Sequence, residues 1–287
     1  MFGVSTIQFV KDLWKEAQED NIFTGAAALS YYLLLSVFPA AIFLLSLLPY
    51  LPIANLQQAI MDLLHQALPE QAASLFEGVI QSVVSNKKGG LLTFGLLFTL
   101  WSASSGLYAI MQQLNITYDV KEGRPFWKTR GTAIVLMILF FILVIGAFAL
   151  MIFGGTIQNT IANFLGNSEA VLITFATIRW IVIAFFLLLG FALIYYFGPD
   201  VEQKFRFITP GSVVGVVLLG LTSLAFRIYI SNFSNYDATY GSLGAVIILL
   251  VWLYISGLVI LIGSEINALI EHYHPEGKSK GEKEEPQ

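Results

Sequence analysis

The chain has 287 residues, of which 56% are hydrophobic and only 12% are charged, and its formal net charge is -4. Soluble domains carry about 25% charged residues, so water cannot be the only solvent of this protein. The chain contains no cysteine, which excludes disulfide bonds and thiolate metal sites. It also lacks a basic stripe of the kind that indicates nucleic-acid binding.

The first segment predicts an amphipathic helix rather than a signal peptide. It has no uninterrupted apolar stretch followed by a small-residue cleavage site. At helical spacing, one face carries Phe9, Leu13, Trp14 and Ala17, and the charged side chains lie elsewhere. We expect this helix to lie in the plane of the lipid headgroups or against the rest of the protein.

Six long apolar segments follow, and each is long enough to cross a bilayer, which needs about 20 apolar residues. Helices are the only open-chain structure that satisfies all backbone groups within hydrocarbon. The sequence therefore predicts an all-α, polytopic membrane protein in which residues 1–272 form one domain. The expected spans are residues 26–48, 91–111, 132–153, 171–197, 208–230 and 242–264.

The distribution of Lys and Arg predicts the orientation of the spans. With six spans, eleven basic residues fall on one side and only Lys87 and Lys88 fall in a loop on the other. We therefore expect both termini to lie in the cytoplasm of a bacterium, with the protein in the inner membrane. The eleven are Lys11, Lys15, Lys121, Arg124, Lys128, Arg130, Lys204, Arg206, Lys278, Lys280 and Lys283.

The segments between the spans carry further expectations. Residues 50–90 are too apolar for a simple loop and predict two amphipathic helices on the outer side, separated at Pro69. Residues 155–167 predict a shorter amphipathic piece. The polar segment 273–287 predicts a disordered cytoplasmic tail.

Several separated motifs, in order, resemble one protein family. They are "TGAAALSYYLLLSVFPAAIFLLSLL", "LWSASSGLYAIMQQLNITYDVKEGRPFWKTR", "YYFGPD", "TPGSVVG" and "NYDATYGSLGAVIILLVWLYISGLVILIGSEINA". Together they cover about residues 10 to 272 and resemble the YihY/virulence factor BrkB family, whose older label is ribonuclease BN. The resemblance implies a bacterial inner-membrane protein with six or so helices, and it brings no catalytic or binding residue with it.

One candidate site combines two arginines with a polar loop. Arg179 and Arg227 lie in apolar segments, and both are expected in the outer half of the membrane, near Asn235, Asp237 and Tyr240. Ionisable groups inside a membrane are unfavourable by at least about 2.5 kcal/mol and have a partner or a task. The set could bind a phosphate or carboxylate. The structural alternative is an Arg–Asp pair that fixes the loop, with Arg227 reaching up to the interface.

Two further features are ambiguous between function and packing. Glu265, at the cytoplasmic end of the last span, could couple proton movement. The alternative is an interfacial carboxylate that pairs with a basic residue of the inner loops or lies close to the N-terminal helix. The "WSASSG" segment, Trp101 to Gly106, could line a polar path or allow close helix packing. Tyr31 and Tyr32 could line a cavity or pack between helices.

The sequence predicts no cofactor, no metal site and no enzyme activity. His272 and His274 are two residues apart and lack the spacing of a helical metal pair, and no nucleotide-binding loop or hydrolase constellation occurs. We therefore expect a transporter or flippase-like protein for an amphiphilic or anionic molecule, such as a membrane lipid or an envelope precursor. The alternative is a membrane scaffold that organises envelope partners without transport.

Overall fold

A computed structural model describes residues 5–47, 58, 61–62, 92–165, 169–203, 205–232 and 242–273. The regular structure of these residues is helical. The helices are α1 (Thr6–Glu19), α2 (Ile22–Leu47), α5 (Leu92–Ala103), α6 (Ser105–Thr117), α7 (Phe126–Leu165), α8 (Glu169–Phe197), α9 (Pro210–Asn232) and α11 (Ser242–His272).

Five of these helices are long and apolar enough to cross a membrane. Their apolar windows are Ile22–Ala40, Phe126–Ala147, Ile173–Phe197, Pro210–Ile230 and Val246–His272. Large apolar side chains on them point outward; Ile181, Leu221 and Ile228 are each about 60% exposed in the isolated protein. An apolar surface of this extent has to face lipid, which confirms the prediction of an all-α, polytopic membrane protein.

The segment expected as the second span, residues 91–111, differs from the prediction because it contains two short helices. α5 ends at Ala103 and α6 begins at Ser105. At the break, the backbone carbonyl of Trp101 accepts hydrogen bonds from the hydroxyls of Ser104, at 2.9 Å, and Ser105, at 3.3 Å. Side-chain donors of this kind compete with the helical backbone ladder, and they explain why the apolar run does not continue as one helix.

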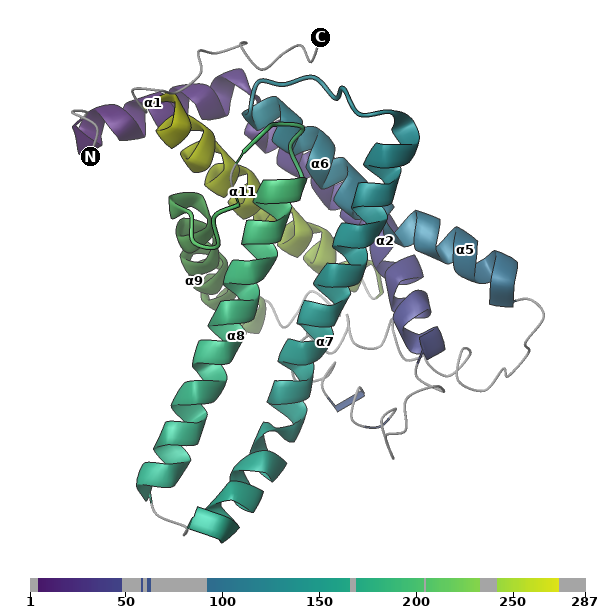
Figure 1. Cartoon of the computed structure of the whole chain (residues 1–287), viewed down its shortest axis with the longest axis vertical. Coiled ribbons are helices and arrows are strands. Elements are labelled where there is room, and N and C mark those ends of the chain that lie inside the picture. The colour runs from purple at the N-terminus through teal and green to yellow at the C-terminus, as the bar shows by residue number, and fades with distance from the viewer. Residues whose placement is uncertain are drawn as a thin grey trace.

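Helix α11 is the centre of the bundle. It packs against α2, α9, α6 and α1, and the buried core contains Leu261 of α11, Leu29 of α2 and Leu114 of α6. α7 and α8 lie side by side and project beyond the other helices at the lower end of the view (Figure 1). α7 has 40 residues, about 60 Å at the rise of an α-helix, so it is longer than the hydrocarbon layer.

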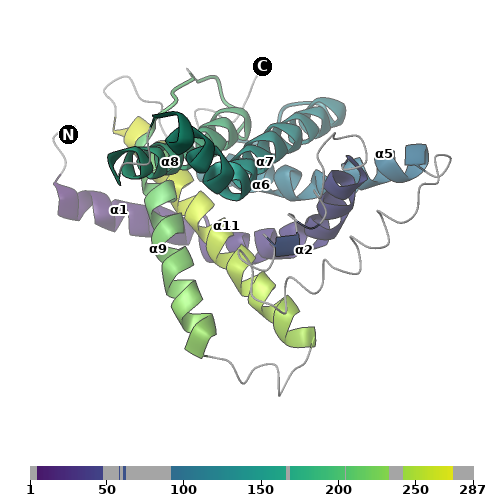
Figure 2. The same cartoon turned by 90° about the horizontal axis from the view of Figure 1, so that it is seen from below.

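Glycines bring α9 and α11 unusually close together. A Cβ atom placed on Gly211 would lie 1.9 Å from the carbonyl oxygen of Gly263, so no larger residue fits there without movement. Thr209 and Ser212 cap the start of α9 through reciprocal side-chain hydrogen bonds to backbone amides, and Pro210 occupies its first position. From below, both helices extend away from the α7–α8 pair (Figure 2).

Helix α1 confirms the predicted amphipathic helix. It lies across one end of the bundle (Figure 1) and packs against α11 and α2. Ala17 is buried, the Phe9 ring contacts the Tyr273 ring at 6.1 Å between centroids, and Trp14 remains 56% exposed. One face of α1 therefore binds the bundle. Trp14, which the spacing placed on that face, instead lies largely exposed beside the Phe23 ring and is left available to lipid headgroups.

The other predicted segments have different outcomes. The separate amphipathic piece expected at 155–167 is instead a continuation of α7 to Leu165, because no proline interrupts the helical pattern there. The two outer amphipathic helices expected at 50–90 fall almost wholly outside the described residues, as does most of the tail expected at 273–287. They stay predictions.

Candidate functional site

A cavity lies between α2 and α6. Its volume is about 310 Å³, at the lower end of the range for ligand pockets. The two helices run in opposite directions, since Gly25 lies under the Gln113 side chain and Gly106 lies against Leu33 and Ser36. The lining residues are Ala28, Leu29 and Tyr32 of α2 and Ser105, Tyr108, Ala109, Gln112 and Gln113 of α6.

The lining combines apolar walls with hydrogen-bonding groups. Two amides, two phenols and one hydroxyl border the space, and they extend about 12 Å along α6 from Ser105 to Gln113. Tyr32 is 47% exposed and its neighbour Tyr31 is 55% exposed, so the α2 side of the cavity reaches the protein surface. A polar space that opens on an apolar helical surface suits a molecule with a polar head and an apolar tail.

Arg130 of α7 supports the wall of this cavity. Its guanidinium stacks over the Trp101 ring at 4.1 Å and lies 5.5 Å from the Tyr108 ring centroid, a cation–π arrangement. One guanidinium nitrogen donates to the Ser105 hydroxyl at 3.0 Å and to the backbone carbonyl of Trp101. Arg130 is only 5% exposed. A fixed positive charge therefore stands directly behind two cavity residues, Ser105 and Tyr108.

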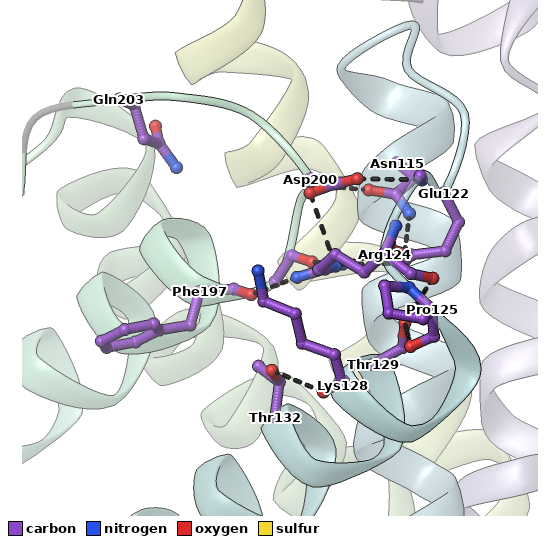
Figure 3. A network of polar contacts seen from close by, with 12 residues as sticks. Asn115, Glu122, Arg124, Pro125, Lys128, Thr129, Thr132, Phe197, Asp200 and Gln203 are labelled. Atoms are coloured by element: carbon purple, nitrogen blue, oxygen red, sulfur yellow. Dashed lines mark hydrogen bonds and ion pairs between the residues drawn. The ribbon is translucent and has the colours of Figure 1, made fainter. Parts of the chain in front are cut away.

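A second polar region joins the end of α6 to the end of α8 (Figure 3). Arg124 donates to both carboxylate oxygens of Glu122, at 2.6 and 2.7 Å, and lies 3.6 Å from a carboxylate oxygen of Asp200. It also donates to the backbone carbonyls of Phe197 and Gly198. A bidentate arginine pair of this kind fixes geometry as well as charge.

Asn115 completes the region around Arg124. Its amide nitrogen donates to Glu122 at 3.0 Å, and its amide oxygen accepts from the backbone N–H of Asp200 at 2.8 Å. Burial alone would raise the pKa of Glu122, but hydrogen bonds and the charge of Arg124 outweigh it, so this pKa is lowered below its ordinary value. We call Asn115, Glu122, Arg124 and Asp200 the Arg124 network.

The described residues include only part of the predicted arginine site. The Arg179 side chain is half-buried and packs on α7, where a Cβ atom on Gly154 would lie 2.9 Å from its Cδ and from one guanidinium nitrogen. Arg227 is exposed on α9. Asn235, Asp237 and Tyr240 lie outside the described residues, so their grouping with the arginines stays a prediction.

Glu265 lies in the bundle interior and is 2% exposed. One of its carboxylate oxygens receives no hydrogen bond from the described residues. Three acidic residues, Asp20, Glu16 and Asp119, act on it electrostatically. Its predicted role in proton coupling stays a prediction.

Two residues of the "WSASSG" segment have contacts that bear on its two interpretations, and a continuous polar path stays a prediction. Gly106 allows close packing, because a Cβ atom there would lie 2.5 Å from the Ser36 hydroxyl of α2. Ser105 lines the cavity, together with Tyr32. Sequence reasoning did not single out Gln112, Gln113 or Arg130. The available signal was two adjacent glutamines within an otherwise apolar stretch, "LYAIMQQL".

Comparison with known proteins places the chain in a family. The family described as virulence factor BrkB matches residues 13–287. The chain belongs to this family. The resemblance seen in the separated motifs is thereby confirmed, and an integral membrane protein follows from the family and the five apolar helices together.

The names of relatives in this family describe either a place in the membrane or a likeness to a ribonuclease. The chain is 39% identical over 264 residues to YfkH of Bacillus subtilis, named as a ribonuclease-like protein, and the match covers 92% of this chain and 95% of YfkH. It is 25% identical to UPF0761 membrane proteins of Xanthomonas axonopodis and Xanthomonas oryzae, over 94% of this chain but 63% of their length. No solved structure matches the chain.

Proposed function

We propose that this protein is a transporter or flippase-like protein that binds an amphiphilic molecule with an anionic or polar headgroup, such as a lipid or envelope precursor. The cavity between α2 and α6 carries the proposal. It offers hydrogen-bonding groups to a headgroup, while the exposed Tyr32 at its edge leaves room for acyl chains to remain in the bilayer.

The position of Arg130 favours an anionic headgroup. Its charge stands behind Ser105 and Tyr108, which both line the cavity. In the low-dielectric interior of a membrane protein, a charge acts over a longer range than in water. An anionic headgroup in the cavity therefore lowers the electrostatic energy of Arg130, and a neutral one does not.

Adjacent alanines of α2 provide a matched test. Ala28 lines the cavity, whereas Ala27 is exposed and does not. We expect Ala28→Phe to fill the cavity and to reduce lipid binding at least about ten-fold, equivalent to about 1.4 kcal/mol, and we expect Ala27→Phe to bind like the wild type. Native mass spectrometry of the purified protein, with added phosphatidylglycerol or phosphatidylcholine, measures both variants.

Movement of lipid requires a second measurement. Proteoliposomes with a fluorescent phosphatidylglycerol report whether the lipid changes leaflet. Slower lipid movement in Ala28→Phe than in Ala27→Phe supports transport. Binding without leaflet exchange in the wild type would replace transport by the scaffold alternative, in which a bound lipid holds envelope partners. Equal binding by both variants would remove the cavity as the site.

Charge selectivity is tested at Arg130. Arg130→Gln is expected to lower the preference for phosphatidylglycerol over phosphatidylcholine about five-fold or more, while Arg130→Lys keeps most of it because the charge remains. A preference unchanged in Arg130→Gln would contradict the anionic assignment.

The outer arginines remain a separate part of the proposal. Arg179→Ala and Arg227→Ala are expected to weaken headgroup-dependent binding if they form a site with Asn235, Asp237 and Tyr240. Binding equal to that of the wild type in both variants would leave the α2–α6 cavity as the sole proposed site.

A further inference from the structure

We propose that the α2–α6 cavity recognises hydroxyl groups on its ligand, and that Gln112 and Gln113 of α6 select them. The expected ligand is an anionic lipid whose headgroup carries adjacent hydroxyls beyond the phosphate, as a glycerol headgroup does. This assignment rests on the proposed function, because it requires a lipid headgroup in the cavity, and it adds the chemical class of that headgroup.

The polar side chains of the cavity have unused hydrogen-bonding capacity. Gln112, Gln113 and Tyr108 are half-buried, and Tyr32 borders them at the surface. Their carboxamides and phenol hydroxyls form no hydrogen bond with any other residue that the structure describes. Polar groups held away from water without partners are unfavourable. A ligand that supplies partners to all four groups is therefore bound more tightly than one that does not.

The chemistry of these groups matches hydroxyls. A carboxamide offers two donors and an acceptor, and a phenol offers one donor and also accepts. Each of them can therefore pair with a hydroxyl, which both donates and accepts. The residues that line the cavity include no acidic side chain, so the described lining offers no carboxylate to a choline or ethanolamine headgroup. A glycerol headgroup is uncharged beyond its phosphate and satisfies the same groups.

Charge and hydroxyl recognition are separated along α6. The Arg130 guanidinium donates to Ser105 at 3.0 Å and lies 5.5 Å from the Tyr108 ring centroid, so the positive charge stands at this end of the cavity. Gln112 follows Tyr108 by four residues, which is one helical turn on the same face, or about 6 Å. This separation is similar to the size of a glycerol headgroup, so a phosphate near Tyr108 leaves the hydroxyls near Gln112 and Gln113.

Gly25 of α2 fixes the position of the Gln113 carboxamide. A Cβ atom added to Gly25 would lie 2.3 Å from the carboxamide oxygen and 3.2 Å from the carboxamide carbon. The side chain of Gln113 therefore crosses from α6 to α2, and any residue larger than glycine at position 25 would displace it. The sequence thus leaves space on α2 for a carboxamide that belongs to α6.

Two lipids of equal charge test hydroxyl recognition in the wild-type protein. Phosphatidylglycerol and phosphatidylpropanol with the same acyl chains differ only in two headgroup hydroxyls. A site that hydrogen-bonds a hydroxyl disfavours an analogue without it, because its own polar groups are left unpaired. We expect native mass spectrometry to give at least about five-fold tighter binding of phosphatidylglycerol. Equal affinities for the two lipids overturn hydroxyl recognition.

The Ala28→Phe variant separates this failure from failure of the proposed function. Equal wild-type affinities, together with weaker binding of both lipids by Ala28→Phe, overturn only the hydroxyl assignment. Binding of both lipids that is unchanged in Ala28→Phe removes the cavity as the lipid site, and hydroxyl selection within it is overturned as well.

The glutamines are tested by the ratio of the two affinities. Gln112→Leu and Gln113→Leu should each lower the preference for phosphatidylglycerol at least about three-fold and leave phosphatidylpropanol binding unchanged. Gln18→Leu, on the exposed surface of α1, is the control and should keep the wild-type ratio. An unchanged ratio in both variants overturns the assignment. An equal loss for both lipids also overturns it, since the glutamines would then support the cavity without selecting hydroxyls.

Gly25→Ala provides a second test that removes no hydrogen-bonding group. It should lower the same ratio by displacing the Gln113 carboxamide, whereas Gly131→Ala, with nothing within 4 Å of its added Cβ atom, should not. A ratio that is unchanged in Gly25→Ala would contradict the placement of Gln113 in the site.

Discussion

The half-buried Arg124 network and the fully buried Glu265 lie at the same end of the bundle, and they differ in how their charges are satisfied. Arg124 binds two carboxylates and two backbone carbonyls. Glu265 is acted on by other acids, and one of its oxygens receives no hydrogen bond within the described part of the chain. A satisfied network stabilises one conformation, whereas an unsatisfied carboxyl marks a place where a proton can act.

Removing Arg124 should give the largest effect. Arg124→Ala leaves Glu122 and Asp200 without their cation and two carbonyls without a donor. We expect the free energy of unfolding to fall by about 2–4 kcal/mol, measured by denaturant titration in mild detergent. Lys128→Ala, an exposed neighbour, is the control and should change it by less than about 0.5 kcal/mol. Equal losses of stability in Arg124→Ala and Lys128→Ala would show that the Arg124 network does not stabilise this end of the bundle.

The close contact between Gly211 of α9 and Gly263 of α11 should give the next largest effect. Gly211→Ala places a methyl group against the Gly263 carbonyl and forces α9 away from α11, with an expected loss of about 1–3 kcal/mol. Gly220→Ala is a control in the same helix, because nothing lies within 4 Å of its added Cβ. It should be neutral or slightly stabilising. A neutral Gly211→Ala would mean that α9 and α11 tolerate separation.

The fall in stability at acidic pH should depend on Glu122 of the Arg124 network. The pKa of Glu122 is lowered in the folded protein, so its contribution is present above the ordinary pKa and is lost as the pH falls through the folded value. Glu122→Gln should therefore flatten the decline in stability below about pH 4.5, the ordinary value. Glu202→Gln should keep the wild-type slope. Thermal unfolding as a function of pH measures both.

The smallest effect is expected at the contact between α1 and Tyr273, which directly follows α11. The Tyr273 hydroxyl donates to Asp12. Burial, followed by Asp12, raises its pKa to about 12. Its contribution is present below the ordinary value of 10.0 and is lost as the pH rises towards 12. Tyr273→Phe should reduce stability by less than about 1 kcal/mol and remove that alkaline loss, whereas Phe9→Leu, at the adjacent ring contact, should retain it.

Most of the helices could be predicted from the sequence, because a run of apolar residues has only helical solutions in lipid. The amphipathic helix that became α1 was predictable for a similar reason, since its apolar face is visible in the spacing of Phe9, Leu13 and Ala17. The break at Ser104 was not predictable from hydropathy. It arises from the hydroxyls of Ser104 and Ser105 and from distant Arg130, which bind one carbonyl.

The candidate sites depended far more on tertiary structure. The sequence by itself predicted that Glu265 lies near a membrane face. It left open whether the carboxylate couples proton movement, pairs with a basic residue or lies close to the N-terminal helix. Only the packing of α1 and α6 against α11 brought Asp20 and Asp119 to it. The Arg124 network likewise joins residues about 80 positions apart. Hydropathy indicates whether each segment lies in lipid or in water. The polar groups that meet are decided by how the helices cross, and no local sequence pattern encodes these crossings.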